Sequence, residues 1–254
     1  MQDHVASPDF SQTSLEDNLF FTEKPILWRL NVKGLLALAG IIGPIVLLIA
    51  DVTAARSAAG YHYILTRDSI SILALMPMGW IQTIGFLTIG LFIELFAAGL
   101  SISIRRSKGF ALSIFLLVCF GFGLLLIGAF HTDYPGDPTT VEGAIHGTAA
   151  RTVFSLLPLA GLLIAPSLKK DPHWQPLFLC TIGIMSFALA WTLVWILIFR
   201  SWPSANQSWF GLYERILVGI EVLWVEIMAI WLLRLSLGKR KRVTATPSTQ
   251  HKTD

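Results

Sequence analysis

The chain has 254 residues, of which 54% are hydrophobic and only 14% are charged, and its mean hydropathy is +0.65. Soluble domains carry about 25% charged residues, so this composition excludes an ordinary soluble domain and indicates a membrane protein. The net charge is +3, but the basic residues flank apolar segments, which is typical of membrane topology and not of a phosphate-binding stripe. We therefore expect the lipid bilayer as a partner, and no nucleic acid.

The chain begins with a polar, mildly acidic stretch that has no apolar periodicity, and this predicts a disordered N-terminal tail over residues 1–32. Six apolar runs follow, at 35–55, 80–104, 110–130, 147–168, 177–199 and 213–235. Each run is close to the roughly 20 residues that a helix needs to cross the hydrocarbon core. A backbone in water-free lipid must satisfy its own hydrogen bonds, so we expect an all-α bundle of six transmembrane helices over 33–236. Residues 237–254 predict a basic, disordered C-terminal tail.

The distribution of Lys and Arg predicts the orientation. One set of flanks holds most of them: Lys24, Arg29, Lys33, Arg105, Arg106, Lys108, Lys169, Lys170, Arg234, Lys239, Arg240, Lys241 and Arg242. The opposite flanks hold only Arg56, Arg67, Arg151, Arg200 and Arg215. By the positive-inside rule, both termini are cytoplasmic and the protein lies in the cell membrane. Loops 56–79, 131–146 and 200–212 then lie at the outer rim.

The first outer loop has a helix-like pattern. Tyr63, Arg67 and Ser71 recur at i, i+4 and i+8, which places them on one face of a helix. We expect either a short interfacial or re-entrant helix that caps the bundle or an ordered loop without a function of its own.

Polar side chains gather in the outer loops, above all between Phe130 and Arg151. The candidate ligand-binding residues are Tyr63, Arg67, Asp68, Ser71, Asp133, His146, Arg151, Glu214 and Arg215. One interpretation is a metal site, for which His131 and His146 are the candidate ligands, although the spacing matches no metal motif. A second is a pocket in which Arg67 and Arg151 hold a phosphate or carboxylate. A third is an ion-paired network that joins the helix ends, in which Arg151 is paired by Asp133, Glu142 or Asp51.

Three carboxyl groups fall inside the apolar runs: Glu94, Glu221 and Glu226. Glu94 and Glu226 lie at the same depth, about 21 Å from the outer ends of their helices at 1.5 Å per residue. A charged carboxylate there costs about 2.5–3.5 kcal/mol or more. Proton-coupled transport and simple hydrogen bonding to neighbouring helices are both open interpretations of these residues.

Several segments together resemble a known family. They are AGIIGPIVLLIAD, YILTRDSIS, GWIQTIGFLTIGL, GAFHTDYPGD, HGTAAR and GLYERI, in this order along the chain. This set resembles the membrane family known as domain of unknown function 998, over about residues 33–236. The resemblance implies a bundle of six or more transmembrane helices and implies no activity. It draws attention to the polar residues of these segments: Tyr63, Arg67, Ser71, Asp133, His146 and Arg215. His131 stands where the family pattern has a small residue or proline.

The sequence leaves three functions open. The first is binding or transport of a small anionic or lipid ligand at the outer rim. The second is an interfacial enzyme that acts on lipid with His and Asp side chains, with or without a metal. The third is a structural scaffold. We find no nucleophile, nucleotide or dinucleotide motif in the sequence, and the sequence does not identify a cofactor.

Overall fold

The computed structural model describes residues 31–201 and 208–238, and the side chains up to residue 197 and from residue 208 onward. The tails predicted at 1–32 and 237–254 lie almost wholly outside these residues. Six long helices are present: α1 (Val32–Ala58), α2 (Gly79–Ser101), α3 (Phe110–Ala129), α4 (Val141–Lys170), α5 (Phe178–Ser201) and α7 (Phe210–Gly238). Each is long and apolar enough to cross a membrane, and no strand occurs in the described part. The all-α, six-span prediction is therefore confirmed, and the protein is a multi-pass membrane protein.

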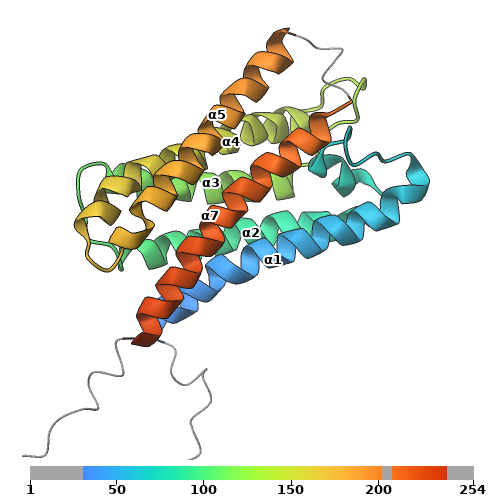
Figure 1. Cartoon of the computed structure of the whole chain (residues 1–254). Coiled ribbons are helices and arrows are strands. Elements are labelled where there is room, and N and C mark those ends of the chain that lie inside the picture. Colours follow the sequence, from blue (N-terminus) through green and yellow to red (C-terminus); the bar gives the residue numbers. More distant parts are fainter. Residues whose placement is uncertain (1–30, 202–207, 239–254) are drawn as a thin grey trace, which may run out of the picture. The chain divides into compact units, whose positions relative to one another are not determined.

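The helices follow one another around a ring (Figure 1). Each packs against the next in the chain, and α7 closes the ring by packing against α1. The interior is filled by large buried side chains, among them Phe96, Leu157, Met185, Leu217 and Trp224. Because lipid tails are as apolar as these side chains, close van der Waals packing, and not removal from water, holds the helices together here.

Small residues allow the closest approaches between these helices. A Cβ atom added to Gly40 in α1 would lie 2.7 Å from the Phe96 ring of α2 and 2.8 Å from Cβ of Ala229 in α7. Gly40 therefore marks a point where three helices meet without room for a methyl group. The outer faces carry exposed apolar side chains, such as Leu48, Phe115 and Leu197, which are the faces that lipid covers.

Helix α4 begins earlier than its apolar run. The sequence predicted a span from residue 147, but the helix starts at Val141, because the Thr140 side chain accepts a hydrogen bond from the Gly143 amide at 3.0 Å and caps the first turn. Glu142 adds an acidic residue to that turn, where the helix dipole favours it. His146 consequently lies inside α4, and not in the preceding loop.

Between α1 and α2, the chain forms a small cap. It contains the 3₁₀ helices η2 (Ala59–Tyr61) and η3 (Ile70–Leu75). The Ser69 side chain caps η3 by accepting from the Ile72 amide, and Ile70 to Leu73 are buried against the bundle. A short capping helix is thus present, but the predicted helical face is wrong. Tyr63 and Arg67 lie in the turns before η3, since the polar stretch 62–69 folds around Asp68 and not into a helix.

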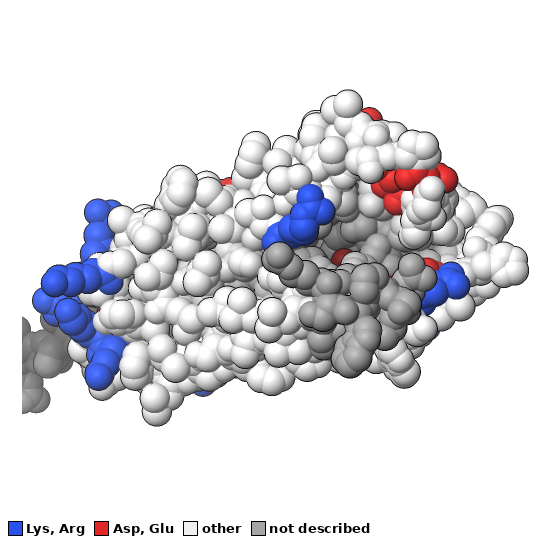
Figure 2. Space-filling model, turned by 90° about the horizontal axis from the view of Figure 1, so that it is seen from above, with Lys and Arg blue, Asp and Glu red and all other residues white. Residues whose placement is uncertain are grey.

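The six spans bring residues 31 and 238 to the same end of the bundle (Figure 1). Lys and Arg side chains gather at this end, whereas acidic side chains mark the opposite end, seen in Figure 2. A third 3₁₀ helix, η4 (Gln175–Leu177), joins α4 to α5 at the basic end. We refer to the end that holds Tyr63, His146 and Glu214 as the cap end.

Candidate functional site

Arg215, in the first turns of α7, is the central charged group of the cap end. Its Nη1 donates to three backbone carbonyl oxygens: Leu65 at 3.0 Å, Asp68 at 3.0 Å and Gly211 at 3.1 Å. Its Nη2 donates to the Tyr63 hydroxyl and lies 3.4 Å from Oδ1 of Asp51 in α1. One guanidinium thus joins α1, the cap and α7, and its planar fork of donors is the reason that Lys could not do the same.

Tyr63 stands against this guanidinium. Its hydroxyl also donates to the Ser69 carbonyl at 3.1 Å, and the guanidinium carbon lies 5.8 Å from the centre of its ring. Burial raises the pKa of Tyr63 to about 12, although Arg215 opposes that shift. The phenol is therefore neutral at physiological pH and acts here as a hydrogen-bonding group.

Arg67 and Asp68 form a separate pair at the surface. The Arg67 Nε and Nη2 atoms lie 2.7 Å and 2.9 Å from the Asp68 carboxylate, and Arg67 is 45% exposed. Burial alone would raise the pKa of Asp68, but the hydrogen bonds from Arg67 and from the Ile64 amide outweigh it and lower that pKa. The same pairing raises the pKa of Arg67. The charge of Arg67 is thus compensated by its own neighbour.

Glu214 and Ser71 line the buried side of the cap. Glu214 is 7% exposed, and its Oε2 accepts from the Ile70 amide at 2.8 Å, so that α7 holds the first residue of η3. Ser71 Oγ lies 2.9 Å from Nε2 of His146, whose Nδ1 lies 2.8 Å from the Phe130 carbonyl oxygen. A carbonyl only accepts, so Nδ1 carries a proton, and in the neutral ring Nε2 accepts from the Ser71 hydroxyl.

The pair of Ser71 and His146 has the arrangement of a nucleophile and its base. The neighbouring amides, however, are occupied: Ile70 N–H is bound to Glu214 and Ile72 N–H to Ser69. Neither is free to stabilise an oxyanion, and Ser71 is only 8% exposed. The geometry therefore favours proton transfer along this pair over acyl transfer to Ser71.

The remaining rim residues do not converge on Arg215. Asp133 accepts from the amide and the hydroxyl of Thr140, at 3.0 Å and 2.7 Å, and so fixes the loop before α4. Its carboxylate fills the space that a side chain on Gly143 would need. Arg151 is exposed and bonds Thr148 in its own helix at 3.4 Å. Asp51, expected as one partner for Arg151, instead pairs with Arg215.

The metal interpretation finds no support in this geometry. Among residues 31–201 and 208–238, no group of three or more His, Cys, Asp or Glu side chains is arranged to hold a metal ion. Both ring nitrogens of His146 already have partners, in Ser71 and Phe130. The Nδ1 atom of His131 lies 3.7 Å from Oε2 of Glu142 at the surface, so the neighbour of His131 is not one of the partners of His146.

The three carboxyl groups within the spans occupy three different places. Glu94 of α2 lies against the backbone of Gly121 in α3. Glu226 of α7 lines a groove toward α1, and Glu221 faces the interior. Glu94 and Glu226, which the sequence predicted to lie at one depth, thus belong to different helix interfaces.

An open groove lies between α1 and α7. Its volume is about 490 Å³, and all but three of its lining residues are apolar or glycine. Asp51 and Arg215 lie at one end and Glu226 at the other, eleven residues along α7, which is about 16 Å at 1.5 Å per residue. Its walls include Ile45, Leu48 and Leu223, which are about half exposed, so the groove opens sideways toward lipid.

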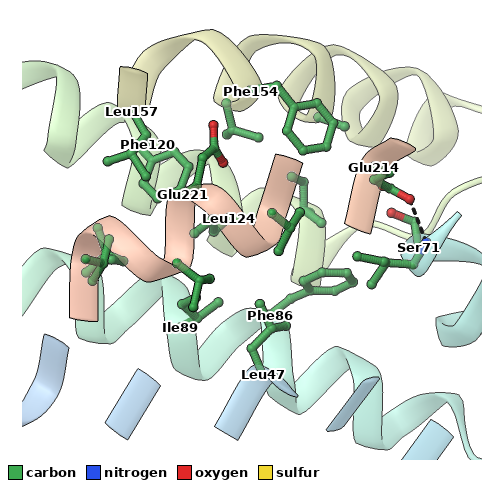
Figure 3. Close-up of a pocket in the computed structure, with 18 residues that line it drawn as sticks. Leu47, Ser71, Phe86, Ile89, Phe120, Leu124, Phe154, Leu157, Glu214 and Glu221 are labelled. Atoms are coloured by element: carbon green, nitrogen blue, oxygen red, sulfur yellow. Dashed lines mark hydrogen bonds between the residues drawn. The ribbon is translucent and has the colours of Figure 1, made fainter. Parts of the chain in front are cut away.

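A second, smaller cavity lies inside the bundle (Figure 3). Its volume is about 50 Å³, and its polar lining consists of Ser71, Glu214 and Glu221 among aliphatic and aromatic side chains. Groove and cavity share four wall residues: Leu47, Ile70, Val218 and Val222. The groove and the cavity therefore lie on opposite sides of the same stretch of α7.

Sequence reasoning missed the pairing of Asp51 with Arg215 and the groove that this pair closes. The only sequence signal was the position of Asp51 at the outer end of the first apolar run. Gln82, in α2, was missed as well. It is fully buried, and its amide has no hydrogen-bond partner among the residues that the structure describes.

Comparison with known proteins identifies a family. The family model described as "Protein of unknown function (DUF998)" matches residues 41–231. No curated protein and no solved structure matches the chain. The matched range includes α2, α3, α4 and α5, most of α1 and α7, the cap and all residues that line the groove.

Proposed function

The chain belongs to the DUF998 family of proteins of unknown function, and we propose that it binds a membrane lipid in the groove between α1 and α7. In this proposal the polar head of the lipid lies at Asp51 and Arg215, and its hydrocarbon chain lies along Val218, Val222 and Leu223. The protein resides in the cell membrane with both termini in the cytoplasm, so the head group is that of an outer-leaflet lipid. The orientation rests on the excess of Lys and Arg at the end opposite the cap.

The observation that carries the proposal is the groove itself. A volume of about 490 Å³ falls within the range of roughly 300–1,000 Å³ that is usual for small-molecule sites. Its length of about 16 Å matches one leaflet of a hydrocarbon core roughly 30 Å thick. A polar pair at the cap end and aliphatic walls below it reproduce the two parts of a lipid in the order in which a leaflet presents them.

The charges at the head end favour a lipid with a neutral or zwitterionic head over a small anion. Arg215 is balanced by Asp51 at 3.4 Å, so the pair carries no net charge to attract a free anion. The two arginines first expected to hold an anion, Arg67 and Arg151, lie apart, and Arg67 is balanced by Asp68. A buried anion without an uncompensated cation would lose several kcal/mol of hydration.

The test is a substitution that fills the groove without disturbing the fold. A side chain at Gly219 would meet nothing within 4 Å at its Cβ position, although Gly219 lines the groove. Gly219→Phe should therefore fold and displace the lipid chain. The matched control is Gly183→Phe in α5, where a Cβ also meets nothing within 4 Å and which does not line the groove between α1 and α7.

We expect a phosphatidylcholine with a photoactivatable acyl chain, added to vesicles that contain the protein, to cross-link to α1 and α7 near Leu48 and Leu223. Mass spectrometry of the digested protein should find these adducts in the wild type and in Gly183→Phe, and lose them in Gly219→Phe. Adducts spread evenly over all the helices, or unchanged in Gly219→Phe, would contradict the proposal.

A further inference from the structure

The interior cavity is lined by a buried carboxyl group, Glu221, one of whose oxygens has no hydrogen-bond partner among the described residues. Glu221 is 4% exposed, and the oxygen without a partner there is its Oε1. Figure 3 shows its side chain pointing into the cavity, among Phe120, Phe154 and Leu157. A charged carboxylate left uncompensated among such side chains costs many kcal/mol, so Glu221 holds a proton there.

The cavity has room for water. A water molecule needs about 10–15 Å³ of cavity measured in this way, and two or more polar partners. The volume of about 50 Å³ is enough for a few molecules. Glu221, Glu214 and Ser71 supply the partners, and Glu214 and Glu221 lie on one face of α7, two turns apart, or about 10.5 Å. The lone Oε1 of Glu221 is the group that such water would satisfy.

One wall of the cavity leads to the cap end. Ser71 lines the cavity and also lies 2.9 Å from Nε2 of His146, which sits in the first turns of α4 beside the loop at 130–140. A hydroxyl between a water-filled cavity and an imidazole both donates and accepts, which is what a proton relay needs. The other charged groups against this region, Asp51 and Arg215, lie across the wall of Leu47 and Ile70 and neutralise each other.

We propose that this cavity is a hydrated proton-binding site, in which Glu221 is the proton carrier and the pair of Ser71 and His146 connects it to the cap end. Glu221 releases its proton to cavity water, the water passes a proton to Ser71 Oγ, and the Ser71 hydroxyl proton moves to Nε2 of His146. The products are a Glu221 carboxylate, unchanged water, a Ser71 hydroxyl and a His146 imidazolium, and the reverse sequence reloads Glu221. The site is distinct from the lipid groove, and its test does not require that the groove bind lipid.

Infrared spectroscopy of the full-length protein in lipid vesicles tests both parts. Glu221→Gln should remove one protonated-carboxyl C=O stretching band, and on transfer to D₂O the wild-type band should shift as its proton exchanges. Ser71→Ala should slow that exchange severalfold, and Ser71→Thr, which keeps the hydroxyl, should restore it. Glu226→Gln, in the groove, should remove a different band and leave the Glu221 band and its exchange unchanged.

Two results would overturn the proposal. If Glu221→Gln removes no protonated-carboxyl band, Glu221 does not carry a proton. If folded Ser71→Ala exchanges the Glu221 proton as fast as the wild type, the path does not run through Ser71. Thermal unfolding of each variant shows that it is folded before its spectrum is used, and Ser71→Cys, close in size, replaces Ser71→Ala should that variant not fold.

Discussion

At the residue scale, the two arginines nearest Tyr63 illustrate how position decides the energetic value of a charge. Arg67 lies at the surface, and water competes for its bond to Asp68, so this pair contributes little to stability. Arg215 is 17% exposed and supplies donors to three carbonyls, to Tyr63 and to Asp51. These bonds join α1, the cap and α7, so the cap depends on Arg215 more than on Arg67.

This difference predicts unequal effects of the same substitution. Arg215→Gln leaves the Asp51 charge without its partner and should lower the free energy of unfolding by about 3 kcal/mol. Arg67→Gln should change it by no more than about 0.5 kcal/mol. Unfolding of both variants in the same detergent, followed by circular dichroism, measures the two effects. Equal losses would mean that the cap is not held through Arg215.

The pKa of Tyr63 gives a prediction at high pH. In the unfolded chain a tyrosine titrates near pH 10, whereas burial raises the pKa of folded Tyr63 to about 12. Below pH 10 both states keep the proton and the contribution to stability is complete. Between pH 10 and 12 only the unfolded state ionises, so this contribution is lost as the pH rises. An ultraviolet absorbance titration should show one phenol ionising near pH 12 in the wild type and not in Tyr63→Phe.

At the element scale, small residues and helix-capping side chains decide how the helices of this bundle pack. The distribution of polar residues on the helix faces decides less. The six spans are apolar around most of their surface, and hydrophobicity alone gives no preferred face in lipid. Close contacts choose the faces: Gly40 selects the contact of α1 with α2 and α7, and Gly85 allows α2 to approach Ala50 of α1. Thr140 caps α4 and so fixes where this helix begins, which in turn sets the position of His146 relative to Ser71.

A pair of glycine substitutions separates packing from helix propensity. In Gly40→Ala the new methyl group meets Phe96 and Ala229 at less than 3 Å, so the helices must move apart, at a cost of about 1–3 kcal/mol. In Gly183→Ala the methyl group meets open space, and helix propensity should stabilise the protein by up to about 1 kcal/mol. Thermal unfolding in detergent should move in opposite directions for the two variants. A gain in both would show that α1 is not closely packed at Gly40.

At the scale of the whole molecule, the two ends of the bundle differ in charge and in chemistry. One end holds the described chain ends and the cluster of Lys and Arg. The cap end holds the groove, the Arg215 contacts and the pair of Ser71 and His146. The family match, over residues 41–231, includes the cap end and leaves out the first turns of α1 and the last turns of α7 at the basic end. The orientation of this bundle in the membrane therefore decides whether the groove faces the outer or the inner leaflet.

Single cysteines at the two ends measure this orientation. In a background with Cys119→Ala and Cys180→Ala, Asp137→Cys lies in the exposed loop before α4 and Lys108→Cys in the exposed turn before α3. With both termini cytoplasmic, a membrane-impermeant maleimide added to intact cells should label position 137 and not position 108. The opposite pattern would invert the topology and assign the groove to the inner leaflet.

The sequence by itself determined the number of spans, their approximate ends and the charge difference between the two sides of the membrane. These properties depend on local hydropathy and on flanking charges, which are added up along the chain and need no knowledge of neighbours. It also identified the polar residues at the rim, because few polar side chains interrupt so apolar a chain.

Only the tertiary structure decided which of these residues meet. Arg67, Arg151 and Arg215 are equivalent by composition, but only Arg215 reaches carbonyl groups and a carboxylate that lie about 150 residues away in the chain. Counting along the sequence predicted one depth for Glu94 and Glu226, but the rotation of their helices turns them toward different neighbours. Hydrogen bonds and cavities depend on how helices rotate against one another, and in lipid that rotation is set by close packing at a few small residues, which hydropathy does not encode.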